Sequence, residues 1–239
     1  ARPLSDIEIE CKEIGAVNEI QVKTLRCRVE KIARPAADVA VLSLKLPINE
    51  RLQFRAGQYI DILLADGKRR SFSLANAPHQ DALLELHIRN YGGAFSTFVF
   101  EQLKEKALLR FEGPLGGFYL REDSDKPIIL LAGGTGFAPI KSIILHALHK
   151  GMTRPMTLYW GVRAKPDLYL GELAREWEKS HPHLRFVPVL SDPAPEDSWS
   201  GRTGLVHEAI LADFPDLSGF SVYACGSVRM VEAAVPDFL

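Results

Sequence analysis

The spacing of apolar residues changes about halfway along the chain, and this change constrains the fold more than any other feature of the sequence. In the first half, Leu84, Leu86 and Ile88 are each separated by one polar residue. Such alternation is typical of strands with one buried face. In the second half, continuous apolar runs such as Ile128–Ala132 lie between segments with helical spacing. We therefore expect two domains of different architecture, covering residues 20–122 and 123–239.

The first domain is predicted to be a six-stranded antiparallel β-barrel. Its strands are short, rich in aliphatic and β-branched residues, and bounded by turn signals such as Asp66-Gly67. Short strands at hairpin spacing favour a small closed barrel. In the segment 83–89, the polar residues Glu85, His87 and Arg89 are expected to face water or a ligand. One helix is predicted over 96–105, and strands are predicted at 20–32, 39–46, 58–64, 69–74, 83–89 and 107–112.

The second domain is predicted to be a doubly wound α/β domain. Continuously apolar strands that alternate with helices indicate a parallel sheet covered on both faces. After the first such strand, Ile140, Ile143, Ile144 and Ala147 form a helical face, and Gly151 supplies a stop signal. Strands are predicted at 128–132, 156–160, 184–190 and 220–225, and helices near 140–148, 170–177, 206–211 and 228–234.

Composition and charge exclude several classes of protein. Of the 239 residues, 46% are apolar and 25% are charged, which is ordinary for a globular protein. With 29 basic and 30 acidic residues, the formal net charge is −1, so neither nucleic acid nor a membrane surface is expected as a partner. No apolar run approaches the roughly 18 residues of a membrane helix, and no secretory signal is recognisable.

The cysteines indicate a reducing compartment. Cys11, Cys27 and Cys225 are odd in number and far apart, which does not fit a disulfide framework. We therefore expect a cytoplasmic protein. Because no two of these cysteines lie at metal-ligand spacing, no metal or iron–sulfur site is expected within this chain.

A glycine-rich turn follows the first strand of the second domain. Ala132–Pro139 joins an apolar strand to a helix, which is the context of a dinucleotide-binding turn. Glycines let the backbone approach a pyrophosphate, and the helix start offers free N–H groups. Pro139 stands where the usual fingerprint has a third glycine, and Ile140 excludes a P-loop. A tight turn without a ligand remains the alternative interpretation.

A second motif, Arg70–Asn76, lies on a predicted barrel strand. Its arginine is suited to bind phosphate through paired N–H donors. Phe72, two residues later, points to the same side of the strand as Arg70. The alternative is a strand with a solvated arginine and a phenylalanine in the core.

The order of five motifs resembles that of the ferredoxin–NADP⁺ reductase family. The resemblance extends from about Leu25 to the end of the chain. Within the family, the chain is most similar to the reductase components of multicomponent oxygenases and to the CDP-6-deoxyhexulose dehydratase reductases. The motifs are Arg70–Asn76, Arg89–Thr97, Gly113–Phe118, Ala132–Pro139 and Tyr223–Ser227.

This resemblance implies that the barrel binds FAD. Arg70 and Ser71 would bind on the pyrophosphate side, Phe72 would lie against the flavin ring, and Ser73 would act in catalysis by hydrogen bonding near flavin N5. The start of the barrel helix would hold phosphate, in keeping with its dipole. The remaining flavin-binding residues implied are His87, Ile88, Arg89, Gly92, Gly93, Ser96 and Thr97.

The resemblance also implies that the second domain binds a nicotinamide cofactor, NADH or NADPH. Arg163 would lie near the adenosine ribose, and we expect NADH. Cys225 would lie beside the nicotinamide as a catalytic residue; a small buried residue is the alternative interpretation. The other binding residues implied are Gly134, Thr135, Gly136, Gly226 and Ser227.

The two ends of the chain depart from the family pattern. The helix over 228–234 follows the fourth parallel strand, so we expect the family's last strand to be absent from this sequence. Residues 1–19 resemble the segment that follows the last cluster cysteine of a plant-type ferredoxin domain. They are predicted to be a linker from an upstream domain that carries a 2Fe–2S cluster. An ordinary N-terminal tail is the alternative.

Together these features predict a reductase that passes electrons from NAD(P)H through FAD to an iron–sulfur protein or domain, and from there to an oxygenase or dehydratase. Two other functions remain open. One is an NAD(P)H:flavin reductase that releases reduced flavin. The other is a non-catalytic subunit that holds flavin as an electron relay and never uses NAD(P)H.

Overall fold

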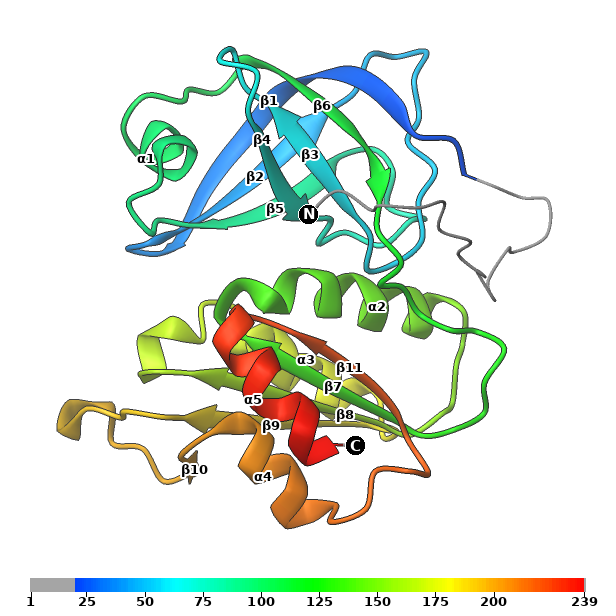
Figure 1. Ribbon diagram of the computed structural model, residues 1–239, viewed down its shortest axis with the longest axis vertical. Helices are drawn as coiled ribbons and strands as arrows, with labels where there is room; N and C mark the ends of the chain where they lie inside the picture. Colours follow the sequence, from blue (N-terminus) through cyan, green and yellow to red (C-terminus); the bar gives the residue numbers. More distant parts are fainter. Residues whose placement is uncertain (1–19, 239) are drawn as a thin grey trace, which may run out of the picture.

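The computed structural model describes residues 20–238, which form a β-barrel packed against an α/β sheet (Figure 1). This architecture confirms the predicted fold class. The linker predicted over residues 1–19 lies outside the described residues. Among the helices that the structure describes, none combines the length and apolar character needed to cross a bilayer.

The barrel is one antiparallel sheet of six strands in the order β4-β3-β6-β1-β2-β5. An isolated bridge between Leu74 and Leu86 joins the two edges, so the sheet curls into a barrel. Alternate residues of each strand point inward to a core that includes Val29, Leu42 and Phe111. The strands are β1 (Lys23–Ala36), β2 (Val39–Lys45), β3 (Tyr59–Leu63), β4 (Arg69–Ser73), β5 (Leu84–Arg89) and β6 (Leu108–Leu115).

The second sheet has five parallel strands in the order β10-β9-β8-β7-β11. The chain starts at β7, adds β8, β9 and β10 on one side, and then crosses to place β11 on the other side. Ligands bind at such a switch point, at the carboxyl ends of the strands. The strands are β7 (Ile128–Gly133), β8 (Met156–Val162), β9 (Leu184–Leu190), β10 (Arg202–Thr203) and β11 (Ser221–Cys225).

Helices cover both faces of this sheet. On one face, α2 (Phe137–His149) and α3 (Gly171–Ser180) pack on side chains such as Leu130 and Leu158. On the other face, α4 (Val206–Asp213) and α5 (Val228–Phe238) pack on Leu131 and Tyr159. The helix α2 lies between the sheet and the barrel, which places the start of α2 at the boundary of the two domains (Figure 1).

Several elements differ from the sequence-based expectation: β1 continues to Ala36 and α5 to Phe238, past the predicted ends at 32 and 234. The barrel helix α1 spans Ala94–Glu101, whereas the prediction ran to residue 105. The apolar spacing continues to the buried Leu103, but the chain leaves the helix at Gln102, whose φ is −126°. The two-residue strand β10 was not predicted, because two residues are too few to show a period.

Candidate functional site

The glycine-rich turn leads from β7 into α2. After Gly133, a single 3₁₀ turn (η1, Gly134–Gly136) precedes the helix. Gly134 has a φ of 53°, the left-handed region that favours glycine, and its carbonyl accepts a hydrogen bond from Trp160 Nε1 at 3.0 Å. No acidic residue lies in the first turn of α2, so the helix start keeps its attraction for an anion.

The turns after β7 and β11 are packed backbone to backbone. Cys225 pairs with Ala132 in the sheet register, which brings the two strand ends together. A Cβ atom on Gly136 would overlap the carbonyl of Cys225 and lie 2.8 Å from the Cα atom of Gly226. Gly136 is therefore required for the packing of these turns, whatever the turn binds. The close packing against Cys225 therefore explains Gly136 more specifically than the approach of the backbone to a ligand does.

A cavity of about 700 Å³ opens beside these turns. We call it the interdomain cavity, because Asp38, Arg89 and Tyr91 of the barrel line it together with residues of the α/β domain. Its volume falls in the range of sites for small molecules and cofactors, which is about 300–1,000 Å³. The rest of its lining includes Gly133, Gly134, Gly161, Arg163, Ser191, Ser227, Arg229 and Met230.

Arg89 stands in the lining of the interdomain cavity and is ion-paired with a carboxylate of each domain. Its Nε donates to Asp38 Oδ2 at 2.5 Å, and its Nη2 donates to Asp167 of the α/β domain. Burial lowers the pKa of Arg89, but the two carboxylates outweigh this effect and raise it. Its Nη1 lies 3.2 Å from the position of a Cβ on Gly134. The structure thus places the Arg89 guanidinium, which the resemblance assigned to the flavin, next to the glycine-rich turn.

Arg163 and Cys225 lie at the carboxyl ends of their strands. Arg163 follows β8, is exposed, and donates from Nη2 to Asp192 Oδ2 at 3.1 Å. Cys225 ends β11, is half-buried, and has no disulfide partner within the described part of the chain. Burial raises the pKa of its thiol to about 11, so Cys225 is a neutral thiol at pH 7 and not a nucleophilic thiolate.

The strand β4 carries the predicted flavin-binding residues in alternation. Arg70, Phe72 and Ser73 are half-buried, whereas Ser71 is exposed and donates to Asp61 Oδ1 at 2.6 Å. Because side chains alternate along a strand, Ser71 points away from the side of Arg70 and Phe72. Within residues 20–238, the Arg70 guanidinium makes one hydrogen bond, from Nη1 to the carbonyl of Arg69 at 2.7 Å. Most of its donors are left for an anion.

The start of α1 lies close to β4. The rings of Phe72 and Phe95 pack at a centroid distance of 5.4 Å, and Phe95 is buried one residue into α1. Gly93 caps this helix without a side-chain hydrogen bond, and no acidic residue lies in the first turn. Ser96 donates to the Gly93 carbonyl at 2.9 Å. The structure thus brings the predicted phosphate-binding segment, which also contains Gly92 and Thr97, to the predicted flavin strand.

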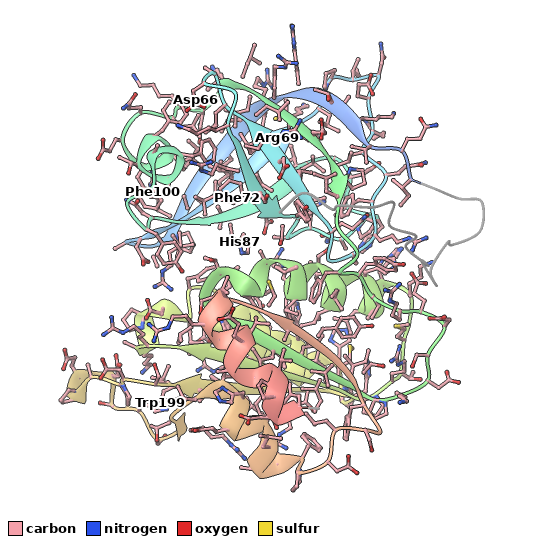
Figure 2. The ribbon with its side chains drawn as sticks, viewed as in Figure 1. Asp66, Arg69, Phe72, His87, Phe100 and Trp199 are labelled. Carbon is pink, nitrogen blue, oxygen red and sulfur yellow. The ribbon has the colours of Figure 1, made fainter. Side chains whose placement is uncertain are left out.

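His87 lies at the edge of the barrel that faces the α/β domain, and Phe72 lies higher on the barrel (Figure 2). The His87 side chain is fully buried: Nε2 is 2.7 Å from Glu85 Oε1, and Nδ1 is 2.8 Å from the hydroxyl of Tyr169. Burial lowers the pKa of His87, so its imidazole is neutral. A contact of His87 or the buried Ile88 with a cofactor would therefore use the backbone.

A polar group of residues around His87 was missed by the sequence analysis. Lys141 Nζ lies 3.0 Å from Glu85 Oε1. Lys141 belongs to the α/β domain and Glu85 to the barrel. Burial raises the pKa of Glu85, but the hydrogen bond from His87 and the charge of Lys141 outweigh it and lower the pKa to about 2. The polar positions of β5 gave a partial signal, since Glu85 and His87 alternate with the core residues. Nothing in the sequence indicated that the second domain covers them.

The donors at both places fit the groups that the resemblance implied. Arg70 and the start of α1, which has no side-chain cap, can hold one diphosphate, and Arg229 and the start of α2 can hold another. An aromatic ring, Phe72, stands beside the first group. Two diphosphate sites on facing edges of two domains are what FAD and a nicotinamide dinucleotide require.

Comparison with known proteins agrees with this geometry. The family model described as "Oxidoreductase FAD-binding domain" matches residues 26–119, and "Oxidoreductase NAD-binding domain" matches residues 130–235. The CDP-6-deoxy-L-threo-D-glycero-4-hexulose-3-dehydrase reductase of Yersinia pseudotuberculosis is 46% identical over 98% of this chain and 70% of its own length. Reductase component 1 of terephthalate 1,2-dioxygenase from a Comamonas species is 38% identical over 96% of this chain and 68% of its own length.

A solved structure shows the same arrangement of domains. The Amycolatopsis cytochrome P450 reductase GcoB superposes with a TM-score of 0.83 at 39% identity, over 92% of this chain and 66% of that chain. The present chain thus spans about two thirds of these longer reductases. It belongs to the ferredoxin–NADP⁺ reductase family, as an FAD- and NAD(P)H-dependent oxidoreductase of the type found in the reductase components of oxygenase and dehydratase systems.

Proposed function

We propose that this chain oxidises NADH with tightly bound FAD and delivers the electrons to an iron–sulfur centre that serves a dehydratase or an oxygenase. One observation carries the proposal: the interdomain cavity is lined by the glycine-rich turn of one domain and by β5 of the other. A nucleotide in this cavity would be held between the two cofactor-binding edges. The proposed domain division is 20–122 and 123–239, supported by the two family matches.

The barrel residues would bind and orient FAD. FAD, when bound, accepts a hydride and can release electrons one at a time. Arg70 and the start of α1, with Gly92, Gly93, Ser96 and Thr97, would hold its pyrophosphate. Phe72, fixed by Phe95, would orient the ring system. Ser73 would place a hydroxyl at the reacting edge of the ring, where a proton is held or released.

Residues of the α/β domain would bind and orient the nicotinamide dinucleotide. Gly134, Thr135 and Gly136 would hold its pyrophosphate, with Arg229 as a counter-charge. Cys225, Gly226 and Ser227 would form the wall beside the nicotinamide. Because the Cys225 thiol stays neutral, its contribution would be to shape this wall and to exclude water from it.

The charge near Arg163 favours NADH over NADPH. Arg163 is paired with Asp192, so its positive charge is already balanced at the place where the adenosine ribose would lie. A 2′-phosphate there would meet the carboxylate of Asp192 as well as the guanidinium. A ribose 2′-hydroxyl, in contrast, can donate to a carboxylate.

The electron acceptor is proposed from the relatives. The enzymes named above are reductases of a dehydrase and of a dioxygenase, which supports such an enzyme as the last acceptor. An iron–sulfur centre as the first acceptor is proposed from the family resemblance alone. The linker predicted over residues 1–19 and the upstream 2Fe–2S domain belong to this proposal. So does a cytoplasmic location, which the free thiols of Cys27 and Cys225 support.

An anaerobic titration tests the function. The purified protein should show a flavin absorption band that bleaches on addition of NADH, and it should bleach more slowly with NADPH. Flavin lost on gel filtration would favour the reductase that releases flavin. A band that dithionite bleaches but NADH does not would favour the electron-relay subunit. No flavin band after incubation with FAD would refute the assignment of Arg70 and Phe72.

A further inference from the structure

Two side chains of α2 hold this helix against the barrel. Lys141 Nζ donates to the carbonyl of Ala75 at 3.1 Å, and the Ser142 hydroxyl donates to the carbonyl of Asn76 at 2.7 Å. Lys141 is 7% exposed and Ser142 is fully buried, so these bonds are shielded from water. Ala75 and Asn76 follow β4 directly, two and three residues after Ser73.

These bonds belong to a larger polar group that we call the interdomain cluster: Glu85, His87, Lys141, Ser142 and Tyr169. Glu85 Oε1 accepts from Lys141 Nζ at 3.0 Å and lies 2.7 Å from His87 Nε2. Since His87 is neutral, the consistent arrangement has Nε2–H donating to Glu85 and Nδ1 accepting from the Tyr169 hydroxyl at 2.8 Å. Each polar side chain of the interdomain cluster thus has a hydrogen-bond partner, either in its own domain or in the other one.

Tyr169 connects the cluster to the glycine-rich turn. Its ring stands edge-on to Trp160 at a centroid distance of 5.3 Å, and Trp160 stacks on Phe137 at 3.9 Å. Trp160 Nε1 in turn donates to the carbonyl of Gly134. An unbroken series of contacts therefore runs from the end of the flavin strand to the turn that would hold the pyrophosphate.

The energetics of this cluster favour a role in geometry. A buried ion pair such as Lys141–Glu85 contributes little net stability, because desolvation offsets the attraction, and apolar residues of the same volume seal an interface equally well. Hydrogen bonds depend on distance and angle, whereas apolar contacts are not directional. The ion pair and its hydrogen bonds therefore fix one relative position of α2 and β5.

We propose that the interdomain cluster is a positioning device, which sets the distance and angle between the nicotinamide-binding turn and the flavin strand and so controls the rate of hydride transfer. The inference rests on the proposed function. It assigns no contact with either cofactor to Lys141, Ser142 or Tyr169. These residues act through the backbone of α2 and of the segment after β4.

Three variants and one matched control test this inference. Lys141→Met removes the ion pair, Lys141→Arg keeps the charge, and Tyr169→Phe removes only a hydroxyl. The control is Tyr159→Phe, which also deletes a buried hydroxyl, bonded to Asp213 Oδ2 at 2.6 Å on the other face of the sheet. Tyr159 and Asp213 take no part in either proposed cofactor site.

The first readout is the rate constant for bleaching of bound FAD by saturating NADH. We expect it to fall about tenfold in Lys141→Met and about threefold in Tyr169→Phe, since a misplacement of about 1 Å costs up to about a hundredfold. Lys141→Arg should recover most of the loss. The FAD content and the dissociation constant for NADH should stay close to those of the parent protein in all variants.

The second readout is amide hydrogen exchange without nucleotide, which does not depend on activity. Exchange in α2 and β5 should accelerate in Lys141→Met and Tyr169→Phe but not in Tyr159→Phe. Unchanged exchange, or a change confined to NADH affinity, would overturn the inference. If the parent protein itself fails to oxidise NADH, the proposed function is wrong, and the exchange result alone decides whether the cluster fixes the domains. Should Lys141→Met not fold, Tyr169→Phe gives the same two readouts.

Discussion

Two neighbouring arginines on β4 differ in what they are bonded to. Arg69 is exposed and forms an ion pair with Glu112 at 2.5 Å, so its charge is already balanced. Arg70 is half-buried, and within the described residues it bonds only to a backbone carbonyl. At the scale of single residues, this contrast favours Arg70 over Arg69 for the anion-binding role that we propose.

Arg70→Gln should therefore weaken FAD binding. Loss of one charge-assisted pair with a phosphate costs about 1.5–3 kcal/mol, which corresponds to a loss of affinity of about tenfold to a hundredfold. Fluorescence titration of the flavin-free protein with FAD measures this loss. Arg69→Gln is the matched control and should bind FAD within about twofold of the parent protein. Equal losses in the two variants would mean that the assignment of Arg70 is wrong.

At the scale of elements, the turns after β7 and β11 form one packed unit. Gly136→Ala places a methyl group against the backbone of Cys225, which has no room to move without shifting β11. Overpacking of this kind costs about 1–3 kcal/mol. We expect a lower Tm and a KM for NADH raised about fivefold or more, with FAD content preserved because the barrel is untouched.

Gly219→Ala is the matched control for this variant. A Cβ atom on Gly219 meets nothing within 4 Å, and this residue lies in the loop before β11. Thermal unfolding and steady-state kinetics of both variants separate the effect of packing from that of any glycine replacement. Normal kinetics in Gly136→Ala would show that the β7 and β11 turns do not hold the nucleotide.

The elements were largely predictable because their signals are local. Alternation in 83–89 and continuous apolar residues in 128–132 predict β5 and β7, and the structure has both. The exceptions have physical reasons. β10 has two residues and forms because Arg202 and Thr203 pair with the edge of β9, a long-range contact. α1 ends because Gln102 leaves the helical conformation, with a φ of −126°, and glutamine gives no sequence signal for a helix end.

At the scale of the whole molecule, the sequence carries local signals for each proposed cofactor site but no signal for how the two domains meet. Arg70, Phe72 and Gly134 lie in motifs, and motifs are local. Lys141 and Glu85 are 56 residues apart and are brought together only when the domains dock. Alone, Lys141 is one polar residue on an apolar helix, and the alternation in β5 cannot distinguish a face covered by water from one covered by another domain.

The buried polar group at this domain boundary makes the stability of the molecule depend on pH. The pKa of His87 is lowered from 6.5 by burial, and that of Glu85 is lowered from 4.5 to about 2 by its partners. In both cases the unfolded state binds a proton at a higher pH than the folded state does. The free energy of unfolding must therefore fall as the pH falls, first below about 6.5 and then below about 4.5.

His87→Gln isolates the first of these two steps. Glutamine can still donate to Glu85 and accept from the Tyr169 hydroxyl, but it does not titrate. The free energy of unfolding of the parent protein, measured with urea between pH 7.5 and 5.0, should fall more steeply than that of the variant. The difference in slope between the two curves should vanish above about pH 7, where histidine is neutral in both states. Parallel curves would mean that folding does not lower the pKa of His87, and the neutral donor series from Tyr169 to Glu85 would then lose its basis.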